Sequence, residues 1–205
     1  MSGSASLVDL LRHGQTEGGS GFRGSTDDPL TGLGMDQMWA ATAGQDGWDR
    51  IVASPLQRCA EFARALAERK RTPLEIDARL REIDFGAWEA QTAEQITQRD
   101  ADGLRRFWAD PIRHPPPGAE AVPAFEARVL SCWRDQLQRH AGSRVLLVTH
   151  GGPIRAILGQ VYRVPWTDLL RLDLPHASLT RVRVERAADG SVQAGVAAAG
   201  GSAPC

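Results

Sequence analysis

Short apolar runs alternate with helical patterns along almost the whole chain, and this alternation limits the possible fold more than any other feature. The runs at 7–11, 51–53, 74–76 and 145–148 have the length of buried strands. Between them, apolar residues recur at helical spacing, most clearly from 122 to 140. Such alternation is typical of a largely parallel sheet with helices on both faces. We therefore expect an α/β protein with three layers, α/β/α.

The remaining helices and strands are predicted from residues that cap helices and residues that interrupt them. Further helices are expected at about 33–42, 54–68 and 153–162, and further strands near 178–184 and 191–198. Thr31 is the expected N-cap of the first of these helices. Ser54 is the expected N-cap of the second, with Pro55 at its first helical position.

The stretch from about 84 to 118 is less regular, with short helical patterns and the run Pro115-Pro116-Pro117-Gly118. No linker separates it from its surroundings, so we interpret it as a lid segment inserted over the sheet. The chain is then one domain over residues 1–199. The tail 200–205 consists mostly of small residues, and we expect it to be disordered.

Charge and composition exclude several classes of function. A net charge of −1 gives no electrostatic basis for binding nucleic acid or an acidic membrane surface. No apolar run approaches the roughly 20 residues that a membrane-spanning helix needs. The 3 cysteines have no metal-binding spacing, and the N-terminus lacks a signal-peptide pattern, so we expect a cytoplasmic protein with free thiols. Several helical faces could form a homodimer.

Two of the expected strands end in a histidine followed by a glycine. His13-Gly14 follows the first strand, and His150-Gly151 follows the strand at 145–148. In open α/β sheets, ligands bind outside the carboxyl ends of the strands. Each histidine alone could be an ordinary loop-end residue. Two at equivalent positions favour a shared site in one crevice.

Two arginines fall at the same expected edge of the sheet. Arg12 directly precedes His13, and Arg58 lies one turn into the helix expected from Ser54. A guanidinium group binds phosphate oxygens in a bidentate fork and stays charged when enclosed. Taken alone, Arg58 could equally be a solvated helix residue.

Glu82 is a candidate acid–base group, because it stands among Ile83, Phe85 and Trp88. A carboxyl group in apolar and aromatic surroundings suits proton donation to a leaving group. The alternative for this segment alone is an acidic residue of a surface loop.

Four segments, in the same order, resemble those of the histidine phosphatase (phosphoglycerate mutase-like) superfamily. They are Arg12-His13-Gly14-Gln15-Thr16, Ser54-Pro55-Leu56-Gln57-Arg58, Arg81-Glu82-Ile83-Asp84-Phe85-Gly86-Ala87-Trp88-Glu89 and Thr149-His150-Gly151-Gly152. The resemblance extends from about residue 7 to 185. It implies that His13 is the nucleophile and Glu82 the general acid and base. It also implies a phosphate pocket formed by Arg12, Arg58 and His150.

The chemistry agrees with these roles. A neutral imidazole can attack phosphorus and form a phosphohistidine. Arg12, Arg58 and a protonated His150 would offset charge on the phosphoryl oxygens. Glu82 would protonate the departing alkoxide and then accept a proton from the hydrolytic water. Such a pocket requires no metal and no cofactor, and the sequence shows no carboxylate cluster or Cys/His spacing for a metal.

The loop after the nucleophile departs from the family pattern. Many members carry Asn six residues after the nucleophilic histidine, where this chain has Gly19. The glycine-rich loop 18–24 could bind phosphate through backbone N–H groups or Ser20, with added charge from Arg23, or could simply be flexible. The remaining phosphate-binding candidates are Thr16 and Gly151.

Segments 21–31 and 107–120 are similar to the α-ribazole phosphatase branch, although Ala119 stands where glycine is common. That branch removes the 5′-phosphate from α-ribazole phosphate or a cobalamin phosphate. The resemblance implies that Trp108, His114 and the proline run lie over the site, with Trp108 stacking on a base-like ring. Alternatively, Trp108 packs a small satellite core.

The chain is compact, whereas mutases of this superfamily usually carry extra segments that enclose the site. We therefore expect a metal-independent phosphomonoesterase acting on a phosphorylated small molecule, namely α-ribazole 5′-phosphate. The alternatives are a broad-specificity phosphatase, a phosphoglycerate mutase and a non-catalytic relative. The full set of five site residues argues against the last of these.

Overall fold

The computed structural model describes residues 5–186 and 192–197, and within these residues six strands form one sheet in the order β3-β2-β4-β1-β5-β6. The strands are β1 (Ser6–Arg12), β2 (Arg50–Ala53), β3 (Leu74–Ile76), β4 (Arg144–Thr149), β5 (Leu179–Arg186) and β6 (Val192–Ala197). The first four in this order are parallel, while β5 runs antiparallel to β1 and β6 antiparallel to β5. The mostly parallel sheet expected from the sequence is confirmed.

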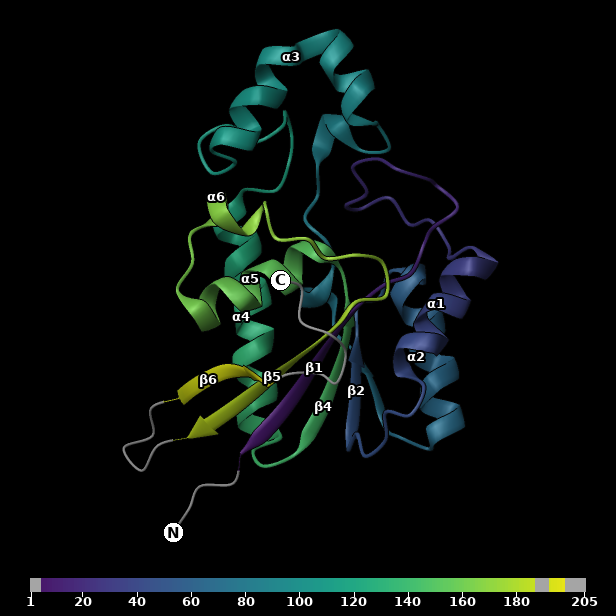
Figure 1. Cartoon of the computed structure of the whole chain (residues 1–205). Helices are drawn as coiled ribbons and strands as arrows, with labels where there is room; N and C mark the ends of the chain where they lie inside the picture. Colours follow the sequence, from purple (N-terminus) through teal and green to yellow (C-terminus); the bar gives the residue numbers. More distant parts are fainter. Residues whose placement is uncertain (1–4, 187–191, 198–205) are drawn as a thin grey trace.

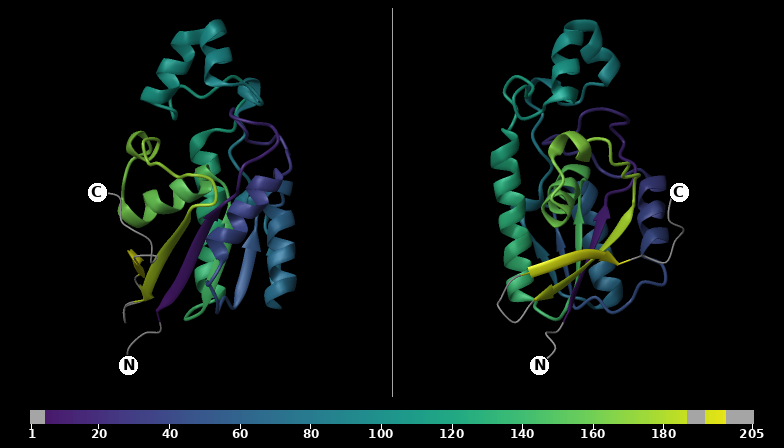
Figure 2. Two further views of the ribbon diagram at one scale, coloured as in Figure 1. Left: turned by 45° about the vertical axis from the view of Figure 1, so that its right-hand side comes forward. Right: turned by 60° about the vertical axis from the view of Figure 1, so that its left-hand side comes forward.

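Helices cover both faces of this sheet (Figures 1 and 2). The helices of the described residues are α1 (Gly32–Thr42), α2 (Gln57–Lys70), α3 (Ala93–Ala109), α4 (Val122–Arg139), α5 (Gly151–Tyr162) and the short α6 (Trp166–Leu169), with 3-10 turns η1 (Ala78–Leu80) and η2 (Gly86–Trp88). Helices α1 and α2 pack on one face, and α4 and α5 on the other. The three-layer architecture is therefore confirmed.

Alternate residues of β1 supply the two halves of the core. Val8 and Leu10 pack toward α4 and α5, whereas Leu11 packs toward α1 and α2. This follows from the two-residue period of a strand, which points successive side chains to opposite faces. All three side chains are buried, and each contributes roughly 1.5–3 kcal/mol to folding by leaving water.

A buried carboxylate interrupts the apolar run of β1. Asp9 accepts hydrogen bonds from Trp48 Nε1 at 2.7 Å, Arg181 Nε at 2.7 Å and Arg144 Nη2 at 2.8 Å. Burial alone would raise the pKa of Asp9, but the bonds from Arg181 and Arg144 reverse the effect and lower it. The charge is tolerated in the sheet because it is paired and hydrogen-bonded.

The start of one helix differs from the sequence prediction. Thr31 caps α1 as expected, accepting from the Gly34 N–H at 2.9 Å. In contrast, α2 begins at Gln57, with Leu56 at the N-cap position, so the expected Ser54 cap is wrong. The Ser54 hydroxyl lies 2.8 Å from His150 Nε2 instead, which gives it a partner outside the helix.

The segment 84–118 is more helical than its sequence pattern indicates. It contains the 17-residue helix α3, capped by a reciprocal pair of hydrogen bonds between Thr92 and Gln95. Asp100 leaves helical geometry, with φ −151° and ψ 69°, and the resulting kink explains why only short helical patterns are visible in the sequence. Figure 1 shows α3 beyond the carboxyl ends of the parallel strands.

The two ends of this lid segment are joined at a neck. The Ala87 N–H donates to the Pro117 carbonyl at 2.9 Å, and the Glu120 N–H donates to the Asp84 carbonyl at 3.0 Å. Above the neck, the lid has a small core of its own, made of Trp88, Ile96, Leu104 and Phe107.

Three further expectations concern the ends of the chain and its thiols. Cys59 and Cys132 are buried free thiols, as expected, and burial raises the pKa of both. The expected disordered tail 200–205 lies outside the described residues. Across the part of the chain that is described, no helix is both long and apolar enough to cross a membrane.

Candidate active site

The two histidines that end strands lie together. His13 follows β1 and His150 follows β4, and these strands are parallel neighbours with Arg12 opposite Thr149. The ring centroids of His13 and His150 are 5.2 Å apart, and both rings are buried. The convergence predicted from the strand ends is confirmed.

His13 is held with one ring nitrogen available for reaction. Its Nδ1 donates to the Gly14 carbonyl at 2.8 Å, which leaves the Nε2 lone pair free. Burial lowers the pKa of His13 to about 3, so the ring is neutral near pH 7. A side chain on Gly14 would place Cβ 2.1 Å from the Gly34 carbonyl oxygen, so only glycine permits α1 to pack this close.

His150 is also neutral, and the expected protonated form is wrong. Its Nδ1 accepts from Arg58 Nε at 3.1 Å, and its Nε2 lies 2.8 Å from the Ser54 hydroxyl. Burial, followed by the charge of Arg58, lowers the pKa of His150 well below its ordinary value. A proton on Nδ1 would point directly at the Arg58 guanidinium group, and the ring is therefore neutral.

Arg58 supplies a fixed positive charge under the loop after His13. Its side chain is fully buried and donates to the carbonyls of Thr26 at 2.6 Å, Gly24 at 2.9 Å and Arg23 at 3.2 Å. The alternative of a solvated helix residue is therefore wrong. Arg58 fixes this loop and His150 at the same time.

Arg12 provides the second charge. Its Nη1 donates to the Leu174 carbonyl, while its Nε is buried and has no hydrogen-bond partner among the described residues. Burial lowers the pKa of Arg12, and the nearby Glu82 opposes this effect. A buried N–H without a partner is uncommon in folded proteins, and at this site it is available to an anionic oxygen.

Glu82 reaches the same site after η1. Its Oε2 accepts from the Gly152 N–H at 3.0 Å, at the start of α5, and its Oε1 accepts from the Ile83 N–H at 3.0 Å. A Cβ on Gly152 would lie 2.0 Å from Oε1, so the glycine makes room for the carboxylate. The first turn of α5 therefore supplies one of the two N–H groups that orient the Glu82 side chain.

Glu82 also forms part of the wall of a mostly apolar cavity of about 170 Å³ between the lid and α5. The cavity is lined by Phe22, Glu82, Ile83, Phe85, Phe107, Trp108, Pro111, Val122, Gly152, Arg155 and Leu170. Trp108 is 48% exposed, and its ring lies 5.3 Å from that of Phe107 and 6.0 Å from that of Phe22. It therefore packs against the edge of the lid core and also borders the cavity.

His114 and the proline run do not border this cavity, contrary to the sequence expectation. His114, Pro115 and Pro117 line a separate cavity together with Trp88 and Arg106. The Pro117 carbonyl accepts from the Ala87 N–H at the neck, and this bond holds the proline run beside Trp88.

The loop candidates are placed as follows. Thr16 is buried and pairs with Leu30 in an isolated β-bridge, while Ser20 is exposed. Arg23 forms an ion pair with Asp28 at 3.2 Å and donates to the Gly18 carbonyl, so its charge is already paired. Gly19, which replaces the family's asparagine, is exposed and has φ +71°.

Sequence reasoning missed Arg155. It lies on α5, four residues after Gly151, and a Cβ on Gly151 would come within 2.8 Å of its Nη1. Its Nε and Nη2 donate to the carbonyls of Leu169 at 2.9 Å and Leu172 at 2.8 Å. Burial lowers the pKa of Arg155, and Glu82 opposes this shift. The spacing of four residues after Gly151, one helical turn, was the available signal.

Stability should fall in acid because His13 and His150 are buried in neutral form. Below pH 6.5 these histidines bind protons in the unfolded chain but not in the native protein. For His13 this difference in proton binding continues down to about pH 3. Each histidine contributes up to ~1.4 kcal/mol per pH unit. His13→Gln should therefore reduce the slope of unfolding free energy against pH, measured by urea unfolding between about pH 4 and 7. An unchanged slope would contradict a neutral native His13.

Within residues 5–186 and 192–197, no group of three or more His, Cys, Asp or Glu side chains is placed to hold a metal ion.

Comparison with known proteins agrees with this geometry. A model of the histidine phosphatase superfamily (branch 1) matches residues 8–194. The chain is 35% identical over 167 residues to glucosyl-3-phosphoglycerate phosphatase of Mycolicibacterium vanbaalenii, covering 76% of this chain and 74% of that protein.

Solved structures share the fold over nearly their full length. Mycobacterial hydrolase 2 superposes with a TM-score of 0.85 at 29% identity, covering 98% of this chain and 93% of the other. The α-ribazole phosphatase from Shigella flexneri superposes with a TM-score of 0.78 at 22% identity, covering 93% and 94%. At that identity, the second likeness shows the common fold alone.

Proposed function

The chain belongs to the histidine phosphatase superfamily (branch 1), and we propose that it is a metal-independent phosphomonoesterase working through a phosphohistidine on His13. One observation carries this proposal. The buried, neutral His13 has its Nδ1 bonded to the Gly14 carbonyl, and Nε2 remains free beside the two guanidinium groups. This is the state an imidazole needs to act as a nucleophile.

The reaction proceeds in two steps. In the first, His13 Nε2 attacks phosphorus, the bond to the ester oxygen breaks, and Glu82 gives its proton to the departing oxygen. In the second, water attacks the phosphohistidine, Glu82 takes a proton from that water, and the N–P bond breaks to release inorganic phosphate and neutral His13. Each step alone has a lower barrier than direct hydrolysis.

Arginine side chains carry the electrostatic part of catalysis. Arg12 and Arg58 stay charged, and they offset charge on the phosphoryl oxygens during transfer. Because His150 is neutral, it acts as an oriented hydrogen-bonding group, fixed by Arg58 Nε on one side and Ser54 on the other.

For the substrate we propose α-ribazole 5′-phosphate. The cavity beside Glu82 supports this, because its walls are largely aromatic and apolar and Trp108 presents an exposed ring there. Such a cavity suits the base-like ring of a nucleoside leaving group. The similarity of segments 21–31 and 107–120 to the α-ribazole phosphatase branch supports the same substrate.

A second candidate is a smaller phosphate ester that carries a carboxylate. Arg155 favours it, because this guanidinium lines the cavity next to Glu82. The similarity to a glucosyl-3-phosphoglycerate phosphatase points the same way, since that protein's name describes a substrate with a carboxylate.

The test is the rate of phosphate release from α-ribazole 5′-phosphate, compared with 3-phosphoglycerate, phosphoserine and nucleotides, all in EDTA. A preference of about 100-fold for the first, or about 2.7 kcal/mol of transition-state discrimination, supports the α-ribazole proposal. A preference for the acids supports the second candidate, and similar rates indicate a broad-specificity phosphatase. Phosphoryl exchange on phosphoglycerate without phosphate release would indicate a mutase.

Trp108→Ala should lower kcat/KM for α-ribazole 5′-phosphate about tenfold, because stacking contributes roughly 0.5–1.5 kcal/mol beyond buried area. The rate with 3-phosphoglycerate should change little. Ile112→Ala is the matched control, since Ile112 is equally exposed, at 48%, on the same lid. An equal loss with both substrates would argue against stacking.

A further inference from the structure

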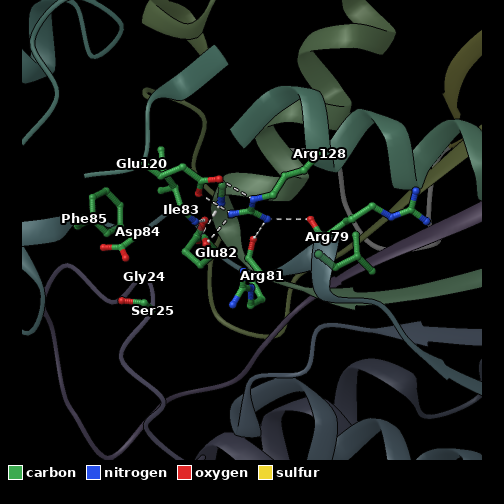
Figure 3. A network of polar contacts seen from close by, with 12 residues as sticks. Gly24, Ser25, Arg79, Arg81, Glu82, Ile83, Asp84, Phe85, Glu120 and Arg128 are labelled. Atoms are coloured by element: carbon green, nitrogen blue, oxygen red, sulfur yellow. Dashed lines mark hydrogen bonds and ion pairs between the residues drawn. The ribbon is translucent and has the colours of Figure 1, made fainter. Parts of the chain in front are cut away.

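The Arg128 side chain of α4 binds the backbone of the segment that carries Glu82 (Figure 3). Arg128 Nη1 donates to the carbonyls of Arg79 at 2.8 Å and Arg81 at 2.7 Å, and Nη2 donates to the Glu82 carbonyl at 2.9 Å. A guanidinium group has five N–H donors in a fixed plane, so it can hold three carbonyls in one arrangement.

Glu120 completes this contact from the neck of the lid. Its two carboxylate oxygens accept from Arg128 Nε and Nη2, both at 2.7 Å. The side chains are 19% and 23% exposed, so the pair is largely screened from water. The Glu120 N–H donates to the Asp84 carbonyl, two residues beyond Glu82. Glu120 therefore fixes the plane of the guanidinium group and the backbone beyond Glu82.

Hydrogen bonds therefore hold both the side chain and the backbone of Glu82. Its carboxylate accepts from the N–H groups of Gly152 and Ile83, and its own carbonyl accepts from Arg128. Among the described residues, neither Arg128 nor Glu120 forms a hydrogen bond with His13 or His150, although the charge of Arg128 contributes to the lowered pKa of His150. The hydrogen bonds that they make to this segment go to Glu82 and its neighbours.

We propose that Arg128 and Glu120 are positioning residues for Glu82, which place its carboxylate for proton transfer to the leaving group. This inference rests on the proposed acid–base role of Glu82. Proton transfer depends steeply on geometry, and a displacement of about 1 Å in a reacting group can lower the rate about 10²-fold.

Arg79 offers a structural comparison on the same segment. Its guanidinium donates to Asp77 within its own turn and to Ser131 and Asp135 of α4. It therefore also joins the segment to α4, but it does not contact Glu82. Loss of its side chain should destabilise the segment without changing the placement of Glu82.

The experiment measures single-turnover phosphorylation of the full chain by an alkyl phosphate and by 4-nitrophenyl phosphate. The alkoxide needs a proton on leaving, whereas nitrophenolate hardly does. We expect Arg128→Lys to slow phosphorylation by the alkyl phosphate about 10²-fold, with a small change in KM and at most a few-fold loss with the aryl phosphate. Lysine keeps the charge but cannot span three carbonyls.

Three variants keep this test decisive. Glu120→Gln retains the side-chain shape and provides the test if Arg128→Lys fails to fold. It should lower the ratio of the alkyl to the aryl phosphorylation rate, as Arg128→Lys does. Arg79→Gln is the control, and it should lower thermal stability with an unchanged ratio. In a Glu82→Gln background, Arg128→Lys should have no further effect on the alkyl phosphate.

Contrary results would distinguish failure of the positioning inference from failure of the proposed acid–base role of Glu82. Equal slowing of both substrates by Arg128→Lys, or the same change of ratio in Arg79→Gln, would overturn the positioning inference alone. An unchanged ratio in Glu82→Gln itself would overturn the proposed acid–base role, and the positioning inference with it.

Discussion

His13→Ala is expected to abolish turnover, lowering kcat by about 10⁴-fold or more, while the fold remains intact. The effect is large because Nε2 of this ring forms the only bond between enzyme and phosphorus in the proposed mechanism. The imidazole is 7% exposed, so its removal also leaves a small cavity, with an expected loss of about 1–2 kcal/mol in unfolding free energy.

Mass spectrometry of the intact protein after rapid mixing and an alkaline quench checks the mechanism behind this loss. Wild type should gain one acid-labile phosphoryl group, and His13→Ala should gain none. His140→Ala is the control, because His140 ends α4, and it should retain full phosphorylation. A phosphorylated His13→Ala protein would place the covalent intermediate on another residue.

The position of the site was predictable because it depends on sheet topology. The carboxyl ends of neighbouring parallel strands meet at one edge, so two strands that each end in His-Gly bring His13 and His150 together. The apolar runs located β1 and β4 well enough for this argument. Asp9 did not disturb the prediction, although its partners Arg144 and Arg181 are apparent only in three dimensions.

The protonation of His150 and the start of α2 could not be predicted, because both depend on contacts between distant segments. Ser54 followed by Pro55 is a good local signal for a helix start, but the Ser54 hydroxyl lies against His150, 96 residues away in the chain. His150 itself is neutral because Arg58 Nε points at its Nδ1. Nothing local in either segment shows these contacts.

The residues around Glu82 were missed for a similar reason. The motif that contains Glu82 is visible in the sequence, whereas Arg128 lies 46 residues further along and donates to the backbone carbonyl of Glu82. Glu120 lies 38 residues beyond Glu82, and its carboxylate accepts from Arg128. Backbone acceptors carry no residue type, so no pairing rule identifies them. The lid helix α3 was hidden by the kink at Asp100. The place expected for His114 followed from the resemblance to the α-ribazole phosphatase branch, and this chain has His114 at a different cavity.

Arg58→Lys is expected to lower kcat/KM about 10³-fold, because the proposed phosphate pocket loses a guanidinium group held in a fixed plane. Arg58 joins three parts of the site, since it contacts the carbonyls of Thr26 and Gly24 as well as His150. Lysine keeps the charge but cannot reach these acceptors in one plane. The unpaired buried groups should cost about 2–4 kcal/mol of unfolding free energy.

Two measurements separate the roles of Arg58 in binding and in folding. Competitive inhibition by inorganic phosphate should weaken in Arg58→Lys if the guanidinium holds phosphoryl oxygens, and urea unfolding should show the loss of stability. Arg64→Lys, on the exposed side of the same helix, should change neither quantity. If Arg58→Lys loses stability but keeps kcat/KM and the affinity for phosphate, Arg58 is an anchor of the loop, and Arg12 alone carries the charge that faces the substrate.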